Sequence, residues 1–443
     1  MEPTTVQGAI ERYEPDQLVV AIPDLALVQG ELGRLGVYCV QEDPDDGLGL
    51  ALLTLQNVAG SPVLRSDDTL VGRVYQAKWH GTPPPGAEIS DLDLLIYKLR
   101  EGFSSEYRGW VPTMGKNRVI APVRGLPYVG GGGEGDPAPS DGAGNVRMSG
   151  PLRGSGPQPW LLPRPTRPGR GVRIGLLDTQ LYPNKWLDGG YVAAAGDLLP
   201  ASAASSSPPP ASEGHATFVA GLILNRAPAA QLDVRRVLDT RALGKVWDVA
   251  KIMADFVGSG VDILNLSFGC YTDDGEPPMV LERAVSLVSP QILLVAAAGN
   301  HGDIDALKAS HSPQARPWTW DLTPKTPVWP AAFANVVAVG ATDRGKLAAF
   351  SPNLPWVDVT APGVGVESTY LTGQVELEFP DPGCSPTRLF PFGFATWTGT
   401  SFAAAGVTGA VAAEIEPGRQ DARRALREVL EAPQGDIRRF EKS

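Results

Sequence analysis

Three short stretches of this chain decide its fold: GLLDT at residues 175–179, EGHAT at 213–217 and GTSFA at 399–403. Asp178 ends an apolar run that is typical of a buried strand, whereas His215 and Ser401 each open a helical run. A serine hydroxyl becomes a nucleophile when an imidazole takes its proton and a carboxylate orients that imidazole. The chain supplies the three groups in the order Asp, His, Ser.

Each of these residues also has a structural interpretation. Asp178 can cap a strand end, a lone histidine is more often structural than catalytic, and the serine of an isolated Gly-Thr-Ser is usually a helix N-cap. Unrelated folds that carry such a triad differ in the order of its members along the chain. The order therefore discriminates between folds and favours chemistry over capping.

Composition limits the class of protein. The 443 residues exceed the usual size of one domain, and 43% are hydrophobic, which is enough for a large core. A formal charge of -11 argues against a nucleic-acid or anionic-membrane partner. The N-terminal residues lack the pattern of a secretory signal and no apolar run suits a membrane helix, so we expect a cytoplasmic protein. Three scattered cysteines predict reduced thiols, with no disulfide framework, zinc site or other cofactor.

The composition also predicts three regions. Residues 1–128 have the strands and helices of a small α+β domain, with strands at 17–22 and 48–55 and helices at 25–35 and 91–99. Residues 129–170 are rich in Gly and Pro and predict a flexible linker. Residues 171–443 form the third region, which ends in an amphipathic helix at 422–430.

The third region alternates between strands and helices. Short apolar runs predict strands at 172–177, 232–237, 261–266, 292–297 and 335–339, and a helical pattern covers 249–257. This alternation predicts an α/β fold with a doubly wound parallel sheet covered on both faces. Functional residues then gather at the carboxyl ends of the strands, where Asp178 stands. A hairpin is expected around Thr372-Gly373.

A fourth stretch ends in an asparagine. The apolar run from Ile292 to Gly299 is followed by Asn300, whose side-chain amide can donate a hydrogen bond to an oxyanion. The backbone N–H of Ser401 would be the second donor. By itself Gly-Asn is only a turn, but here it supplies the group that the three other stretches lack.

Over about residues 171–415 the chain resembles the subtilisin-like serine proteases (subtilases, peptidase S8 family). The matching segments are Asp178-Thr179, His215 with Thr217-Phe218-Val219-Ala220-Gly221, Asp262 to Gly269, Ala298-Gly299-Asn300, Trp329-Pro330-Ala331-Ala332-Phe333 and Gly399 to Ala404. The resemblance implies peptide-bond hydrolysis through an acyl-enzyme, with Asp178, His215, Ser401 and Asn300 as the catalytic residues.

By the same resemblance, Ser267-Phe268-Gly269 forms the strand that pairs with the substrate backbone and one wall of the primary pocket. Ala297-Ala298-Gly299 forms the other wall. The resemblance allows calcium but assigns it no ligands, and the implied partner is a protein or peptide substrate. The absence of a signal and the tethered N-terminal domain favour a narrow processing protease.

The chain departs from the family pattern at Gln180, at Ala216 and at Ala405-Gly406. These departures support a rival hypothesis, a catalytically impaired peptide-binding module. A nucleotide-binding α/β enzyme is a second rival, but no glycine fingerprint follows the strand at 172–177. Two interpretations of the N-terminal domain remain open: an inhibitory propeptide released when the linker is cut, or a permanent domain that docks substrate or a partner.

Overall fold

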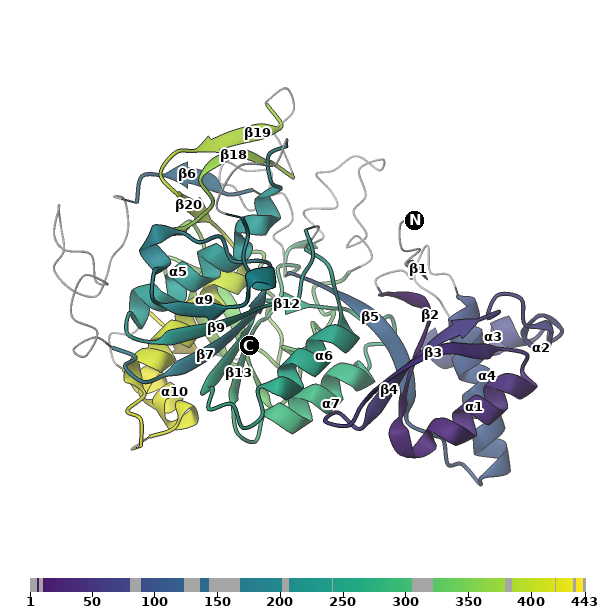
Figure 1. The fold of residues 1–443 in the computed structure, drawn as a ribbon. Helices are drawn as coiled ribbons and strands as arrows, with labels where there is room; N and C mark the ends of the chain where they lie inside the picture. Colours follow the sequence, from purple (N-terminus) through teal and green to yellow (C-terminus); the bar gives the residue numbers. More distant parts are fainter. Residues whose placement is uncertain are drawn as a thin grey trace.

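The computed structural model describes residues 6–7, 11–79, 89–122, 136–142, 168–200, 207–240, 242–304, 322–378, 385–418, 420–432 and 436–440. Figure 1 shows a smaller N-terminal domain packed beside a larger domain, and one strand of the N-terminal domain extends into the larger one. Among the helices in these ranges, none combines the length and the apolar character needed to cross a bilayer.

The larger domain is built on a sheet whose seven central strands are all parallel. Their spatial order is β8 (Tyr191–Ala193), β9 (Gln231–Arg236), β7 (Arg173–Asp178), β11 (Ile263–Leu266), β13 (Leu293–Ala297), β14 (Val336–Asp343) and β16 (Val359–Pro362). Short antiparallel strands β21 (Arg438–Arg439) and β15 (Lys346–Leu347) pair with β16 and β14. The predicted doubly wound parallel sheet is therefore confirmed.

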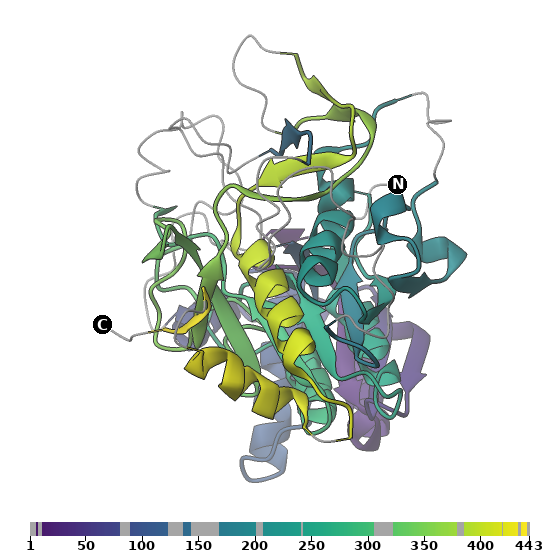
Figure 2. The same ribbon diagram turned by 90° about the vertical axis from the view of Figure 1, so that its left-hand side faces the viewer.

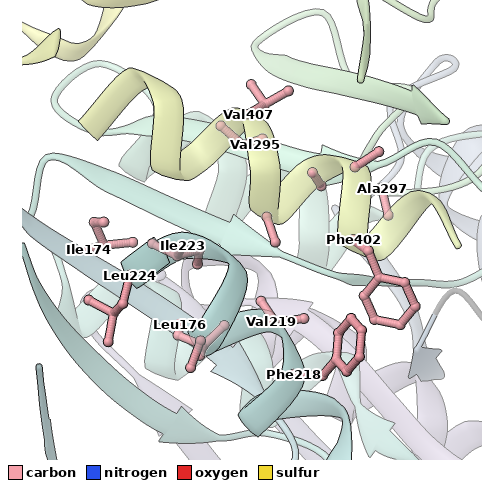
Figure 3. Packing of buried hydrophobic residues seen from close by; sticks show 14 of the residues in the cluster. Ile174, Leu176, Phe218, Val219, Ile223, Leu224, Val295, Ala297, Phe402 and Val407 are labelled. Atoms are coloured by element: carbon pink, nitrogen blue, oxygen red, sulfur yellow. The ribbon is translucent and has the colours of Figure 1, made fainter. Parts of the chain in front are cut away.

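Helices cover both faces of this sheet. One face carries α5 (His215–Arg226), α9 (Thr400–Glu414) and α10 (Ala422–Glu431), and the other carries α6 (Val246–Asp255) and α7 (Met279–Val288) (Figures 1 and 2). Because strand side chains alternate, Ile174 and Leu176 of β7 pack in the cluster under α5 and α9, whereas Leu177 joins the opposite one (Figure 3).

Helix α9 lies at the centre of its layer. It is apolar all round and buried over nearly its whole length, as expected of a helix with no solvent face. Small residues allow close packing: a Cβ added to Gly409 would lie 2.8 Å from the carbonyl oxygen of Ile223 in α5. This packing fixes the position of the helix that begins at Thr400.

The N-terminal domain is an antiparallel sheet with helices on its outer face (Figure 1). Its strands are β1 (Val6–Gln7), β2 (Arg12–Ala21), β3 (Tyr38–Asp45), β4 (Leu50–Gln56) and β5 (Met114–Pro122), and its helices are α1 (Leu25–Arg34), α2 (Pro62–Arg65), α3 (Leu70–Trp79) and α4 (Asp91–Glu106). Its inner face packs on α6 and α7, where Val19, Leu48 and Leu50 join their apolar cluster.

Strand β5 continues beyond its own domain. Its last four residues pair antiparallel with two short strands of the larger domain: Val119 and Ile120 with β10 (Gly244–Lys245), and Ala121 and Pro122 with β12 (Phe268–Gly269). Ile120 is fully buried among the side chains that line α6 and α7. The two domains therefore share one continuous sheet.

A further sheet is built from the region before Ser401 and from the predicted linker. It consists of β17 (Val366–Thr369), β20 (Phe394–Trp397) and β6 (Ala138–Ser140), and β18 (Gly373–Glu376) pairs with β19 (Thr387–Phe390) beside it. The predicted hairpin around Thr372-Gly373 is wrong, because β17 and β18 turn there but pair with different partners. Strand β6 was not expected within 129–170.

The remaining described helical segments are single turns. They are η1 (Ile22–Asp24), η4 (Lys185–Leu187), η5 (Ala195–Asp197) and η6 (Ala211–Gly214). The last of these leads directly into α5 and so helps to set where His215 lies.

Candidate active site

Asp178 and His215 form a buried hydrogen-bonded pair at the carboxyl end of β7. The Nδ1 atom of His215 lies 2.8 and 2.9 Å from the two carboxylate oxygens of Asp178. The two residues are only 1% and 4% exposed. A carboxylate held against Nδ1 fixes the tautomer in which Nε2 carries the lone pair, which is the state that accepts a proton.

Backbone contacts hold this pair in place. The N–H of Thr179 donates to a carboxylate oxygen of Asp178 at 2.7 Å, and the N–H of Ala216 donates to the Thr179 hydroxyl at 3.1 Å. Immediately before α5, Gly214 leaves room for a tyrosine: a Cβ there would lie 2.0 Å from the Tyr370 ring. The end of β7 and the start of α5 are thus fastened to each other.

Ser401 lies in the first turn of α9. Its hydroxyl donates to the carbonyl oxygen of Ser267 at 3.3 Å, and the Ser267 hydroxyl donates to the carbonyl oxygen of Ser401 at 3.3 Å. The helix N-terminus carries a partial positive charge that favours developing negative charge nearby. The sequence-predicted serine therefore faces the strand that the sequence assigned to substrate.

A buried polar chain anchors this contact. The Thr408 hydroxyl donates to the side-chain oxygen of Asn265, whose amide donates to the Ser267 hydroxyl at 2.9 Å. These groups connect the third turn of α9 to the end of β11. Each of the three side chains donates one hydrogen bond in this network, which offsets part of the cost of burying them and anchors the first turn of the helix.

Asn300 lies beside the same helix turn. Its side-chain oxygen accepts hydrogen bonds from the N–H of Thr400 at 2.9 Å and from the Thr400 hydroxyl at 3.0 Å. With the oxygen thus occupied, the orientation of the amide group is set, and its nitrogen is directed to the Gly399 side. Gly299 adopts a φ of +113° and a Cβ there would lie 2.7 Å from the His301 ring, so a glycine is required.

Two aromatic rings surround His215, and sequence reasoning missed both. Trp397 meets the imidazole edge-on with ring centroids 5.8 Å apart, and Phe402 lies at 5.6 Å. Phe402 also packs on Phe218 of α5 (Figure 3). Trp397 and Phe402 flank Ser401 in sequence, so their contacts bring the imidazole and the serine-bearing helix together. An aromatic residue near a serine gives no periodic signal that would have identified it.

The predicted substrate strand is occupied by the chain itself. Phe268 and Gly269 pair with Pro122 and Ala121 of β5. On the other predicted wall, Ala297 and Ala298 are buried at and after the end of β13, and the N–H of Gly299 donates to the Thr400 hydroxyl. Sequence reasoning placed this strand but missed its occupant, because no local pattern specifies a partner strand so distant in sequence.

The departures from the family pattern fit without backbone strain. Gln180 has no positive φ, and its side-chain amide donates to the carbonyl oxygens of Gly196 and Leu198. Ala216 is buried within the first turn of α5.

Among the described residues, no cluster of three or more His, Cys, Asp or Glu side chains is arranged to hold a metal ion. Calcium therefore still has no assigned ligands. Cys270 is buried, and burial raises the pKa of its thiol to about 12. Cys384 lies outside the described residues.

Comparison with known proteins places these observations in a family. Residues 169–432 match the sequence model described as the subtilase family. The chain is 31% identical over 278 residues to Subtilisin Savinase of Lederbergia lenta, covering 57% of this chain and 82% of that protein. It is 31% identical to an alkaline protease of Shouchella clausii, over 57% of this chain and 58% of that protein.

Among solved structures, a lanthipeptide protease is 24% identical, with a TM-score of 0.43, and is covered over 78% of its chain and 58% of this one. The self-cleaved protease domain of PatA is 26% identical, with a TM-score of 0.42, over 88% of its chain and 60% of this one. The family match spans both the parallel sheet and the helix that bears Ser401. The chain belongs to the subtilase family of serine endopeptidases.

Proposed function

We propose that Asp178, His215 and Ser401 hydrolyse peptide bonds through an acyl-enzyme. The Ser401 oxygen attacks the carbonyl carbon while His215 takes its proton, and Asp178 stabilises the imidazolium that forms. His215 then returns the proton to the leaving amine, and water hydrolyses the ester by the same route. The observation that carries this proposal is the buried Asp178–His215 pair, packed through Phe402 onto the helix of Ser401.

The oxyanion of the tetrahedral intermediate requires donors next to Ser401. We assign this role to the Asn300 amide and the Ser401 N–H, because the other side of the Asn300 amide is already bound by Thr400. Donors that are fixed before the reaction stabilise the developing charge without reorganisation. Ser267, Phe268 and Gly269 then serve as the strand that holds the substrate backbone, and Ala297, Ala298 and Gly299 as the facing wall.

A fluorophosphonate tests the chemistry directly. It should label the wild-type chain at Ser401, and Ser401→Ala and His215→Ala should abolish labelling. Intact-protein mass spectrometry followed by peptide mapping measures both. If a folded wild type stays unlabelled, the alternative of a catalytically impaired peptide-binding module replaces the enzyme.

The same structure supports an inhibitory role for the N-terminal domain. A peptide substrate that pairs with β12 must take the place of β5, whose Pro122 and Ala121 fill that edge. Further contacts reinforce the docking: the backbone N–H of Trp247 in α6 donates to the side-chain oxygen of Asn117 in β5, and Lys251 pairs with Asp43 at 3.1 Å. We propose that this domain blocks the site until the chain is cut after β5.

This blocked arrangement supports a narrow substrate range, since only chains able to replace β5 reach Ser401. The processing role in the cytoplasm stays a prediction from the sequence. Purified wild type should convert to two fragments that separate between residues 122 and 136, whereas Ser401→Ala should remain intact. An intact wild type that hydrolyses added peptides would instead establish the N-terminal domain as a permanent docking domain.

A further inference from the structure

The chain that precedes the larger domain binds it a second time, at the edge of β20. Strand β6 pairs antiparallel with β20, with Ala138 opposite Thr396 and Ser140 opposite Phe394. Strand β20 ends at Trp397, four residues before Ser401 in the sequence. Because β6 runs in the opposite direction, its first residue, Ala138, pairs nearest to the end of β20 that leads into Ser401.

Strands β5 and β6 both pair with segments that lie next to Ser401 in the structure or in the sequence. Strand β5 ends at Pro122, which pairs with Phe268, the neighbour of the residue whose carbonyl oxygen accepts the Ser401 hydroxyl. Strand β6 begins on the strand that leads into Ser401. The last described residues before position 123 therefore lie beside the strand that contacts Ser401, and the first described residues after position 135 lie beside the strand that leads into it.

Specific polar contacts hold the segment that contains β6. Asp136 is 8% exposed, and its carboxylate accepts the N–H of Glu378 at 2.9 Å. The Arg388 guanidinium in β19 donates to the carbonyl oxygen of Pro137 at 3.1 Å. Pro139 lies in β6, which is an edge strand, where a residue without an N–H is tolerated. A ladder with side-chain anchors is the pattern of peptide recognition by strand addition.

We propose that the edge of β20, with Arg388 and the Glu378 N–H, is a binding site for the peptide chain on the C-terminal side of the bond that Ser401 attacks. Its ligand class is an extended peptide with an aspartate followed by proline and small residues, and Asp136–Ser140 is the resident occupant. The proposal rests on the proposed function of Ser401. It implies that a cut after β5 leaves the downstream segment bound, so that β6 stays on β20 in the processed enzyme.

The test uses full chains that carry Ser401→Ala, so that no cut occurs and binding is separated from catalysis. In a vacated chain, residues 136–141 are replaced by Gly and Ser. A fluorescein-labelled peptide of residues 136–142 is titrated against the parent and the vacated chain, and fluorescence anisotropy gives the Kd.

We expect saturable binding to the vacated chain and binding at least about tenfold weaker to the parent, whose site is filled. Arg388→Ala in the vacated chain should also weaken binding by about tenfold, which is what one hydrogen bond from a charged donor contributes.

Arg424→Ala is the matched control, because Arg424 lies on α10 and pairs only with Glu428 among the described salt bridges. It should leave the Kd unchanged. Hydrogen exchange in the uncut parent provides a second measurement that needs no free peptide: Arg388→Ala should speed exchange in β6 and β20, and Arg424→Ala should not. The proposal is overturned if the vacated chain does not bind the peptide, or if Arg388→Ala changes neither Kd nor exchange. Failure of Ser401 to react with a fluorophosphonate would overturn the proposed function and leave this binding result standing.

Discussion

This protein contains two buried groups of ionisable side chains that differ in size and in composition. At the candidate active site, Asp178 and His215 form one pair. Between the domains, a docking cluster gathers three carboxylates and three cations, namely Glu11, Asp93, Asp273, Lys78, Lys116 and Arg118. Every member except Asp273 belongs to the N-terminal domain, so Asp273 is the link to the larger domain.

The docking cluster is internally compensated. Lys78 lies 3.1 Å from Asp273 and 3.3 Å from Asp93, and Lys116 lies 2.6 Å from Asp93. Burial raises the pKa of the Glu11 carboxyl, but Arg118, Lys116 and Lys78 lower it by more, to about 2. The pKa of Glu11 therefore lies below the ordinary pH range, whereas the proposed mechanism requires His215 to gain and lose a proton. The docking cluster therefore keeps the charge of Glu11 constant, whereas the Asp178–His215 pair is proposed to transfer a proton.

The largest expected effect is the loss of kcat when Asp178 of the Asp178–His215 pair is replaced. Asp178→Asn should lower kcat of the processed enzyme by about ten thousandfold, because the amide stabilises the wrong imidazole tautomer. Peptide hydrolysis measures kcat, and hydrogen exchange across β7 and α5 shows whether the fold is kept. A loss of less than tenfold with an intact fold would mean that Asp178 only caps the strand.

Asn300→Asp removes the amide that would donate to the oxyanion but keeps an oxygen that can accept hydrogen bonds from Thr400. The carboxylate still accepts from Thr400 but has no amide to donate, so kcat should fall by about a hundred- to a thousandfold with KM little changed. Thr400→Val is the comparison, since it removes the hydroxyl contact while Asn300 remains. If Asn300→Asp keeps full activity, the oxyanion donor lies elsewhere.

Asp273→Asn breaks the link in the docking cluster. Removing one charge of a buried, compensated group costs roughly 3–5 kcal/mol, because its partners stay buried. In the Ser401→Ala chain, hydrogen exchange in β5 should therefore speed up by about a hundredfold or more. The exposed Glu276, which forms none of the described salt bridges, provides the control, and Glu276→Gln should leave exchange in β5 unchanged. Equal exchange in both variants would show that apolar packing alone holds the domain.

The pH dependence of docking tests the charge of Glu11 in the docking cluster. Since the folded pKa of Glu11 is below its usual value of 4.5, its contribution to stability is complete above pH 4.5 and is lost as pH falls toward about 2. Hydrogen-exchange protection factors of the β5 amides in the Ser401→Ala chain should be constant from pH 8 to 5 and fall below pH 4.5. The global Tm would not isolate this effect, because the pKa of the buried His301 is lowered to about 4 and its contribution to stability is lost below pH 6.5. A fall between pH 8 and 5 would indicate that another group controls docking.

The smallest effect is expected at Cys270, which lies beside Arg118 and Glu11 at the domain junction. Burial raises the pKa of this thiol to about 12, so at pH 8 the thiolate that alkylating reagents need is scarce. Iodoacetamide should leave Cys270 unmodified in the folded chain and modify it in denaturant, as peptide mapping would show. Rapid modification of the folded chain would mean that the domain junction opens.

The sequence by itself determined the parallel sheet and the candidate reacting groups. Short, mainly apolar runs at β7, β11 and β13 predict strands buried on both faces. Asp178 and Asn300 end or follow such strands, and His215 and Ser401 begin helices. Ser267 to Gly269 were placed by resemblance. Information of this kind is local, because spacing along the chain sets which element a residue belongs to.

Only the tertiary structure decided which segments pack against the candidate active site and which side chains join the two domains. The pairing of Ala121 and Pro122 with β12, the docking cluster around Lys78 and the edge strand β6 join residues more than a hundred positions apart. Strand pairing and charge compensation depend on the partner and leave no periodic trace in either segment. The wrong hairpin at Thr372-Gly373 has the same cause: strands flank this point, but each pairs with a partner that the tertiary structure supplies.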